Sequence, residues 1–317
     1  MMDGTKAKIA ILLATYNGAR YLPQQLDSIL AQTVTDWHLL ISDDGSRDET
    51  PEILREYQRR WPDRITLVAH DVPTGSSMKN FMLLTRQAGA YDYVMYCDQD
   101  DVWLPEKISM TLAKMRETEN GQPETPCLVH TDLKVVREDL SVKSESFFYS
   151  SMLRADRDQL HRLVIQNIVT GCTVMINHAL WQLAVLPVSG GQIRMHDGWF
   201  ALIASALGRI GFVEQPTMLY RQHGDNVVGA KNVRSFQYIL AAPGRLRQNR
   251  QSIRLCQSQA GALETTLGDR LTQEQRGMLR AFADAPRQGK LRRLAVIFQY
   301  KIWLLGWRRK LAEILLI

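Results

Sequence analysis

Carboxylates are concentrated at one point near the end of the first third of the chain. Asp98, Asp100 and Asp101 fall within four residues, directly after the apolar run 93–97. That run has the length and composition of a buried β-strand. Carboxylates this close repel one another, and hard divalent cations such as Mg²⁺ are held by carboxylates together with substrate phosphates. The segment therefore predicts a metal-bridged diphosphate site, with an acidic polar turn as the alternative.

Other polar residues follow other apolar runs. Thr15, Tyr16 and Asn17 come after the run 8–14, and Asp43 and Asp44 come after the run 37–42. The carboxyl ends of strands are where open α/β sheets bind ligands. Three polar loops at one sheet edge predict a binding site, although Asn-Gly at 17–18 is also an ordinary turn signal.

The elements that must position these residues alternate between strand and helix. Apolar runs predict strands over 8–14, 37–42, 64–69 and 93–97. Amphipathic spacing predicts helices over 23–32, from residue 50 onward and over 77–87. The residues after the acidic segment predict a turn into a helix with Pro105 near its first position. This alternation indicates an α/β protein with a mostly parallel central sheet flanked by helices.

The second half of the chain is more mixed. Short apolar runs predict strands over 128–131 and 172–176, and residues 195–207 predict a helix. From about residue 232 the pattern is helical. We therefore predict a catalytic domain over 1–230 and a C-terminal helical region over 231–317.

Composition limits the class of protein. The 317 residues are 45% hydrophobic and 23% charged, as in ordinary globular proteins. The four cysteines form no C-x-x-C pair, which favours a cytoplasmic protein with free thiols. No apolar stretch approaches the ~20 residues of a membrane-spanning helix. The net charge of +6 has much of its excess near the C-terminus, without a nucleic-acid motif. We expect no nucleic-acid partner and favour an anionic membrane surface.

The last segment, 291–317, combines leucines and tryptophans with flanking basic residues. Lys301 interrupts its apolar run, so the segment does not predict a spanning helix. This composition is typical of a helix lying at a membrane interface. A helix docked on the catalytic domain or on a dimer partner explains the pattern equally well.

The motifs at 9–18, 42–46 and 98–101 resemble, in order and spacing, those of the inverting family 2 glycosyltransferases with a GT-A fold. The resemblance covers roughly residues 8–229. Residues 196–199, His-Asp-Gly-Trp, and 220–226, Tyr-Arg-Gln-His-Gly-Asp-Asn, resemble the rhamnosyltransferase-like branch. The resemblance implies a nucleotide-sugar donor, a divalent cation (Mg²⁺ or Mn²⁺) and direct displacement at the anomeric carbon.

The resemblance also implies roles for single residues. Asp43 corresponds to the family's acceptor for the pyrimidine ring, and Asp98 and Asp100 correspond to its metal-binding carboxylates. His223 is a candidate third metal ligand or diphosphate donor, or an ordinary satisfied polar residue. The remaining candidates for nucleotide contact are Thr15, Tyr16, Asn17, Asp44, Lys79, Asp98 and Arg221.

Asp197 corresponds to the family's general base, which takes the proton of the attacking hydroxyl. Its place at the start of a predicted helix also suits a capping carboxylate. His196 precedes it where the family usually has an acidic residue, so the match at this motif is incomplete.

The sequence thus predicts an inverting transferase that moves a sugar, dTDP-L-rhamnose first or otherwise a UDP-sugar, to a saccharide acceptor. We expect the acceptor to be lipid-linked and the product to be a cell-surface polysaccharide. Two other classes stay open. A sugar nucleotidyltransferase would need a Gly-rich phosphate loop after the first strand, where this chain has few glycines. A non-catalytic carbohydrate-binding protein with a relic site would not need the acidic segment.

Overall fold

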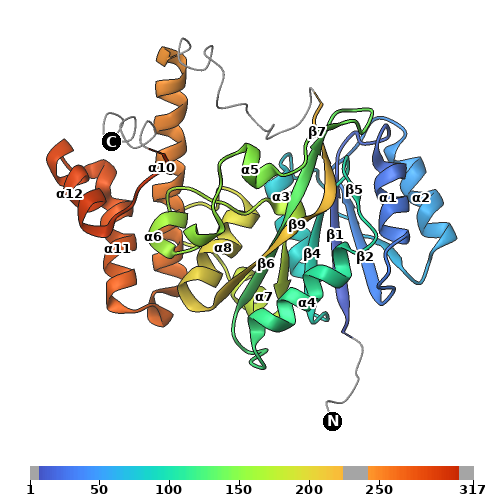
Figure 1. Ribbon diagram of the computed structural model, residues 1–317, viewed down its shortest axis with the longest axis horizontal. Helices are drawn as coiled ribbons and strands as arrows, with labels where there is room; N and C mark the ends of the chain where they lie inside the picture. Colours follow the sequence, from blue (N-terminus) through green and yellow to red (C-terminus); the bar gives the residue numbers. More distant parts are fainter. Residues whose placement is uncertain (1–6, 224–241, 307–317) are drawn as a thin grey trace. The chain divides into compact units, whose positions relative to one another are not determined.

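The computed structural model describes residues 7–223 and 242–306 of the chain (Figure 1). These residues form two compact units. The first holds the described residues up to Tyr149, Thr170–Val185 and those from Arg209 onward to His223. The second holds Ser150–Val169, Leu186–Gly208 and the described residues from Ala242 onward. The predicted domain boundary near residue 230 lies outside the described residues.

The first unit begins with the alternation that the sequence predicts. Its strands are β1 (Ile9–Thr15), β2 (Trp37–Asp43), β3 (Ile65–Leu67) and β4 (Tyr93–Asp98). Its helices are α1 (Leu22–Leu30), α2 (Thr50–Arg60) and α3 (Ser77–Gln87). Prolines in the first turns of α1 and α2 favour helix starts there, because proline has its φ angle fixed near the helical value.

The remaining elements of this unit are more varied. They are β5 (Val102–Trp103), α4 (Lys107–Glu119), β6 (Cys127–Val136), β7 (Val142–Ser144), α5 (Phe147–Ser150, ending in the second unit), a 3₁₀ turn (Gly171–Thr173), β8 (Met175–Asn177), α7 (His178–Ala184) and β9 (Arg209–Arg221). β6 extends well beyond the predicted run 128–131, and β9 was not predicted; the two strands pair with each other along most of their length.

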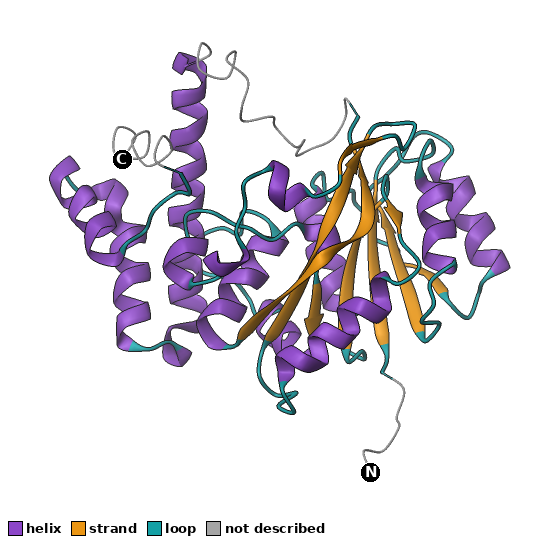
Figure 2. Cartoon of the chain, in the orientation of Figure 1, coloured by secondary structure: helices purple, strands orange, loops and turns teal. Residues whose placement is uncertain are grey.

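The strands form one sheet with the order β3-β2-β1-β4-β8-β6-β9-β5, and β7 pairs with β6 (Figure 2). The first four strands in this order are parallel, as the sequence predicts. Beyond β4 the sheet is mixed, since β8 is antiparallel to both of its neighbours whereas β6 and β9 are parallel. This arrangement confirms the predicted α/β architecture.

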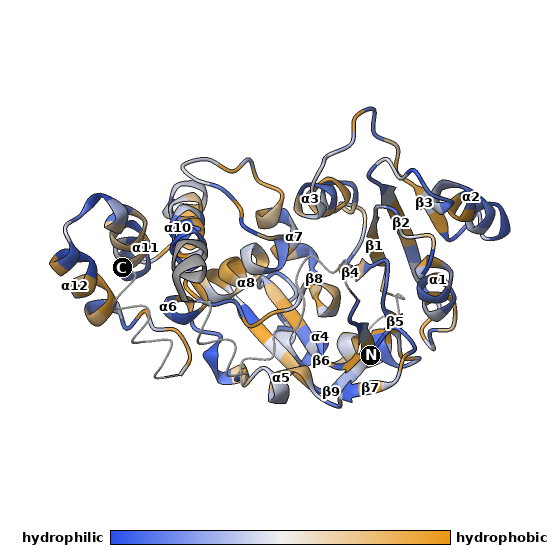
Figure 3. Cartoon of the chain, turned by 90° about the horizontal axis from the view of Figure 1, so that it is seen from above, coloured by the Kyte–Doolittle hydropathy of each residue, from blue (hydrophilic) through white to orange (hydrophobic). Residues whose placement is uncertain are grey.

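Connection geometry explains which helices cover which face. The chain moves from β1 through β2 to β3 in one direction along the sheet and then returns to β4 beside β1. Because such crossovers are right-handed, reversing the direction places α3 on the face opposite α1 and α2. Figure 3 shows α3 and α7 on one side of the sheet and α1 and α4 on the other. The reversal makes the border between β1 and β4 a topological switch point, where ligands bind in such sheets.

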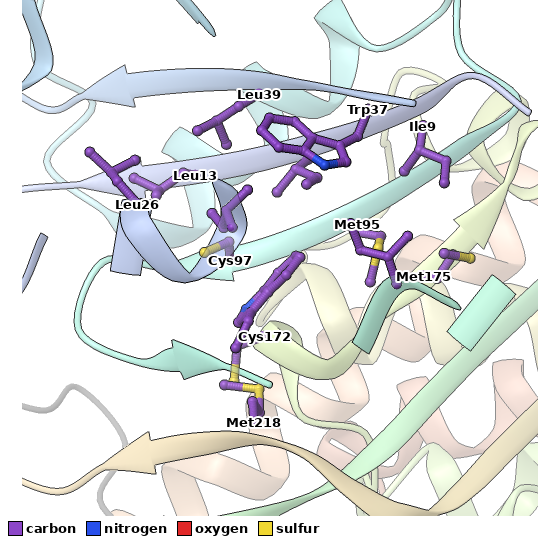
Figure 4. Packing of buried hydrophobic residues seen from close by; sticks show 14 of the residues in the cluster. Ile9, Leu13, Leu26, Trp37, Leu39, Met95, Cys97, Cys172, Met175 and Met218 are labelled. Atoms are coloured by element: carbon purple, nitrogen blue, oxygen red, sulfur yellow. The ribbon is translucent and has the colours of Figure 1, made fainter. Parts of the chain in front are cut away.

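The core of this unit follows the two-residue period of the strands. Ile9 and Leu13 of β1 and Leu39 of β2 belong to one buried cluster, in which Leu26 of α1 lies beside Leu13 and Leu39 (Figure 4). Met95 and Cys97 of β4, with Cys172 and Met218, continue this cluster in the same view. A packed face fixes the strand register, because a one-residue slip would turn every apolar side chain away from the helices.

The helix begins two residues after Pro105, close to its predicted start, but the segment before it differs from the predicted turn. Val102 and Trp103 pair with β9 as strand β5 instead of forming a simple turn. Helix α4 begins at Lys107, with Glu106 as its N-cap, so Pro105 stands just before the cap. Pairing with a strand more than 100 residues away draws the chain out before the helix can begin.

The second unit is helical. Its helices are α6 (Leu160–Leu163), α8 (His196–Leu207), α10 (Ala242–Leu267), α11 (Gln273–Asp284) and α12 (Lys290–Tyr300), with 3₁₀ turns at Ala155–Arg157, Gly268–Arg270 and Ala285–Arg287. A capping box between Thr272 and Gln275 starts α11. The prediction of helices in the C-terminal region is confirmed for the described residues. None of the helices described is both long and apolar enough to cross a membrane.

Candidate active site

The strand register of the first unit brings the predicted polar loops to one edge of the sheet. Thr15 at the end of β1 lies opposite Asp43 of β2, and its neighbour Ala14 lies opposite Asp98 of β4. The loops after these three strands therefore begin at the same level, beside the switch point. The prediction that the polar clusters meet at one sheet edge is confirmed.

Gln99 ties the acidic loop to the loop after β1. Its Oε1 accepts hydrogen bonds from Thr15 Oγ1 at 2.5 Å and from the backbone N of Tyr16 at 2.8 Å, while its Nε2 donates to Tyr16 O at 3.1 Å. A Cβ on Gly18 would lie 2.4 Å from Gln99 Oε1, so only glycine allows this approach. The sequence motif contains Gln99, but nothing in its local pattern predicts this clamp.

Asn17 joins the loop after β1 to the loop after β2. Its backbone N donates to Ser46 Oγ and its Oδ1 accepts from the backbone N of Arg47, each at 2.8 Å. Asn17 has a φ of 49°, in the left-handed region that asparagine tolerates. Ser46 Oγ in turn donates to Asp43 Oδ1. This network holds the Asp43 carboxylate, which stays partly exposed, at the sheet edge.

Asp44 shapes a neighbouring loop. It is buried, and its two oxygens accept from the backbone N of Thr74 at 2.5 Å and of Gly75 at 2.9 Å. These bonds hold the loop before α3, on whose first turn Lys79 is exposed. Asp44 therefore fixes the loop that leads into α3 and to Lys79. Direct contacts of Asp44 and of Lys79 with a nucleotide stay predictions.

Asp100 and His223 lie together, although 123 residues separate them. His223 Nε2 is 2.6 Å from Asp100 Oδ2. Their side chains are only 8% and 14% exposed, for His223 and Asp100 respectively. The Tyr21 ring packs against the imidazole, with 5.0 Å between ring centroids. Two of the three predicted metal ligands thus form one partly enclosed pair.

Asp98, the third predicted ligand, belongs to a second group with Asp101 and Cys172. Ligand atoms of these three residues lie within 4.8 Å of one another. Asp101 is fully buried and accepts from the backbone N of Arg221 at 3.1 Å. Burial, reinforced by the nearby charges of Asp100 and Asp98, raises the pKa of Asp101 well above its usual range. Asp101 therefore holds the acidic loop on its buried side, through the bond from Arg221.

Lys107 is a buried cation near Asp101 and Cys172. Its place in the sequence did not identify it as a candidate site residue. Its Nζ donates to Thr217 Oγ1 at 3.3 Å and lies 4.9 Å from the centre of the Trp103 ring. Burial lowers the pKa of Lys107 to about 8, and the neighbouring Cys172 and Asp101 oppose that shift. As the first residue of α4, it resembles an ordinary helix-start lysine in the sequence.

Arg221, a predicted nucleotide contact, is buried and bonded to several parts of the first unit. Its Nε donates to Asp100 O at 2.9 Å, and its two terminal nitrogens donate to Gln24 Oε1 and Glu138 O. Its guanidinium lies 4.7 Å from the centre of the Tyr21 ring. Arg221 therefore fixes the acidic loop from the end of β9, and a direct bond from it to a nucleotide stays a prediction.

We expect an Arg221→Lys variant to be less stable by about 2 kcal/mol, because a lysine cannot reach these separate, partly buried acceptors at once. The free energy of unfolding in urea measures the change. Arg20→Lys is the matched control, since the Arg20 side chain is 69% exposed and bridges Glu138 at the surface. The control should change stability by no more than about 0.5 kcal/mol. Equal changes in both variants would contradict the anchoring role.

Asp197, the predicted base, lies in the first turn of α8 in the second unit. Its Oδ1 accepts from the backbone N of Gly198 at 2.6 Å. Burial raises the pKa of Asp197 to about 6, whereas bonds from Gly198 and Asn167 and the charge of Arg194 act in the opposite direction. Asp197 is not the N-cap of α8, which is Met195. Its carboxylate nevertheless accepts from one of the first backbone N–H groups of the helix, so the capping alternative stays open beside the proposed base.

Three comparisons place this arrangement among known proteins. A family model described as glycosyl transferase family 2 matches residues 10–183. The dTDP-rhamnosyl transferase RfbG of Shigella flexneri is 28% identical over 226 residues, which are 69% of this chain and 74% of that protein. The first unit, with an acidic loop at the switch point of a mixed sheet, has the architecture of the GT-A glycosyltransferases. The chain belongs to glycosyl transferase family 2.

Solved structures share the fold at low sequence identity. TarS of S. aureus, residues 1–349 in complex with UDP-GlcNAc, gives a TM-score of 0.58 at 14% identity, covering 92% of this chain and 80% of that one. The mannosyltransferase PcManGT of Pyrobaculum calidifontis, in complex with GDP-Man and Mn²⁺, gives 0.51 at 17% identity, covering 94% and 86%. These likenesses confirm the predicted GT-A fold.

Proposed function

We propose that this protein transfers a sugar from a nucleoside diphosphate donor to a saccharide acceptor, with inversion at the anomeric carbon. The observation that carries the proposal is the acidic loop after β4, clamped by Gln99 to the loop after β1 and joined by His223 at Asp100. A donor diphosphate and a divalent cation suit these groups. The first candidate donor is dTDP-L-rhamnose, supported by the relative RfbG, and a UDP-sugar is the second.

The nucleoside would lie over the ends of β1 and β2. Asp43, held by Ser46, offers a carboxylate acceptor to a pyrimidine ring N–H. Tyr16 is 52% exposed, so its ring is available to stack on a base. Thr15 and Asn17 would then act mainly by fixing the loop that carries Tyr16. Lys79 adds a positive charge at the start of α3 for the diphosphate.

The predicted metal ligands suit Mg²⁺ or Mn²⁺ by their chemistry, although Asp98 groups with Asp101 and Cys172 in the structure and would have to turn toward the Asp100–His223 pair. Asp98 and Asp100 supply carboxylate oxygens, which both cations prefer, and His223 supplies a nitrogen that Mn²⁺ accepts more readily than Mg²⁺. PcManGT, which has the same fold, was solved with Mn²⁺. A bound divalent cation neutralises negative charge on a departing diphosphate. Arg221 and Asp101 keep the loop in place for this purpose.

Asp197 would act as the general base for the acceptor hydroxyl. A carboxyl with a pKa of about 6 is ionised at neutral pH and is a stronger proton acceptor than an ordinary aspartate. Because a single displacement with inversion needs only this one base, it is the simplest course.

A panel of nucleoside diphosphates and nucleotide sugars, tested by thermal shift with and without Mn²⁺, examines the donor proposal. Ligand at roughly 100 times its Kd should add about 2.7 kcal/mol to the free energy of unfolding. We expect the largest metal-dependent shifts with dTDP or UDP compounds. A relic carbohydrate-binding protein should show no metal-dependent nucleotide binding, and that result would overturn the proposal.

We also propose that the acceptor is lipid-linked and that α12 contacts the anionic inner face of the cytoplasmic membrane. Leu291 and Phe298 are 84% and 61% exposed, and their seven-residue spacing places them on one side of the helix. Arg292, also exposed, and Lys290 add positive charge near them. Ile297, whose side chain points about 100° away from that of Phe298 around the helix, is buried in the second unit. Residues 307–317, the rest of the predicted membrane segment, lie outside the described residues.

A Phe298→Asp variant should bind anionic vesicles more weakly and transfer sugar to a lipid-linked acceptor more slowly, while transfer to a short soluble acceptor is unchanged. Deleting residues 291–317 is a less specific test, because it also removes Ile297 and the bond that Leu305 N donates to Gln166. Gln299→Ala, on an exposed neighbouring residue, is the control. Equal losses on both acceptors would favour a purely structural helix, and unchanged vesicle binding would exclude α12 as the contact.

A further inference from the structure

The segment that leads into the Asp197 turn is bonded along α10. The backbone N of Arg194 donates to Gln259 Oε1 at 2.7 Å, and the backbone N of Gln192 donates to Ser258 Oγ at 3.1 Å. Gln259 is only 6% exposed, although it is a polar residue. All of these residues belong to the second unit. Side chains of α10 thus supply acceptors for backbone N–H groups of a stretch without secondary structure of its own.

The same stretch lies unusually close to the backbone of α10. A Cβ on Gly191 would be 2.0 Å from Ser258 O and 2.9 Å from Ala262 N. Any other residue would therefore force the segment off the helix. Gly190, beside it, has a φ of 72°, a value that glycine adopts without strain. The path of the chain before α8 is set by contact with α10 at several points.

Gln259 reaches from this segment to the turn that carries Asp197. A Cβ on Gly198 would lie 3.6 Å from Gln259 Nε2 and 3.6 Å from Asn167 Nδ2, so both amides border that turn. The Asn167 side chain also acts on the Asp197 carboxyl, whose pKa it lowers. Gln259 Oε1 meanwhile holds Arg194 N, three residues before Asp197. One amide therefore bonds the chain before the carboxylate and borders the glycine that follows it.

We propose that Gln259 is a positioning residue for Asp197, so that α10 is part of the acceptor-activating machinery instead of an accessory extension. The inference rests on the proposed role of Asp197 as the base. Without an acceptor for Arg194 N, the first turn of α8 can shift, and a base displaced by about 1 Å can lose up to 100-fold in rate. The nucleotide-binding residues belong to the first unit and make none of these contacts.

A Gln259→Met variant should show kcat lowered roughly 10-fold or more, with KM for the donor and nucleotide Kd unchanged. Gln259→Glu keeps an acceptor oxygen in the same place and should restore most of kcat. Gln251→Met, at an exposed position of the same helix, is the matched control and should behave as wild type. Circular dichroism and the midpoint of thermal unfolding verify that each variant is folded.

A double-mutant cycle separates this inference from the proposed base. If Gln259 acts through Asp197, Gln259→Met should lower kcat little further in an Asp197→Asn background. An inactive Asp197→Asn enzyme together with a fully active Gln259→Met enzyme would overturn the positioning role alone. A fully active Asp197→Asn enzyme would overturn the proposed base itself. Equal loss of kcat and of donor binding in Gln259→Met, without rescue by glutamate, would indicate general structural damage and also overturn the inference.

Discussion

An Asp100→Ala variant should lose metal-dependent nucleotide binding and sugar transfer together. Asp100 Oδ2 is the carboxylate oxygen that meets His223 Nε2, so the substitution removes one proposed metal ligand and its contact with a second. A cation at a departing diphosphate supplies several kcal/mol of charge stabilisation, and we expect a loss of roughly 10³-fold in kcat/KM. Titration calorimetry with dTDP or UDP, with and without Mn²⁺, measures the binding independently of activity.

The fold should survive this substitution, because the bond from Arg221 Nε goes to the backbone oxygen of Asp100, which alanine keeps. Asp63→Ala, at an exposed carboxylate before β3, is the control and should bind nucleotide normally. His223→Ala should weaken the response to Mn²⁺ without abolishing it, since the carboxylates remain. Normal metal-dependent turnover in Asp100→Ala would remove Asp100 from the ligand set.

An Asp197→Asn variant should lower kcat by roughly 10²-fold or more, the usual contribution of a general base. The amide keeps the shape of the side chain and its bond from Gly198 N, but it cannot accept the hydroxyl proton. Donor binding should be nearly unchanged, because the residues proposed to bind the nucleotide belong to the first unit. Single-turnover rates at saturating donor separate this loss from a binding defect.

The pH dependence of kcat gives a second test of the same residue. Because a base must be unprotonated, the rate should fall about tenfold per pH unit below the Asp197 pKa of about 6. His196, its buried neighbour, has a pKa lowered by burial to about 3 and is neutral over this range. The fall of kcat near pH 6 should be absent from the residual activity of Asp197→Asn. A kcat close to that of the wild type in this variant would rule out Asp197 as the general base.

The raised pKa of Asp197, which favours catalysis, should lower the stability of the folded protein at neutral pH. The folded-state pKa of Asp197 is raised, so folding favours the protonated form, and the ionised carboxylate costs stability above pH 6. Asp197→Asn should therefore unfold at a higher temperature than wild type at pH 7.5. The difference should vanish below about pH 4, where the carboxyl is protonated in both states.

Local patterns determined the first half of the fold. The burial of β1 and the amphipathic spacing of α1 and α3 are properties of neighbouring residues, and these elements lie close to their predicted positions. The position of the acidic segment at a strand end, and its meeting with two other loops, followed from the same patterns through the geometry of parallel sheets. The family resemblance carried by these motifs is confirmed by the family model.

The sequence by itself could not decide which of the neighbouring carboxylates faces the site and which is buried. Asp100 and Asp101 are adjacent, yet one faces His223 and the other is buried beneath the loop against Arg221. That division depends on β9, which lies about 120 residues later and reaches the loop only through long-range strand pairing. The clamp by Gln99 and the support of the Asp197 segment by Gln259 have the same origin. Sequence spacing encodes local periodicity, whereas partners far apart along the chain meet only once the tertiary structure has formed.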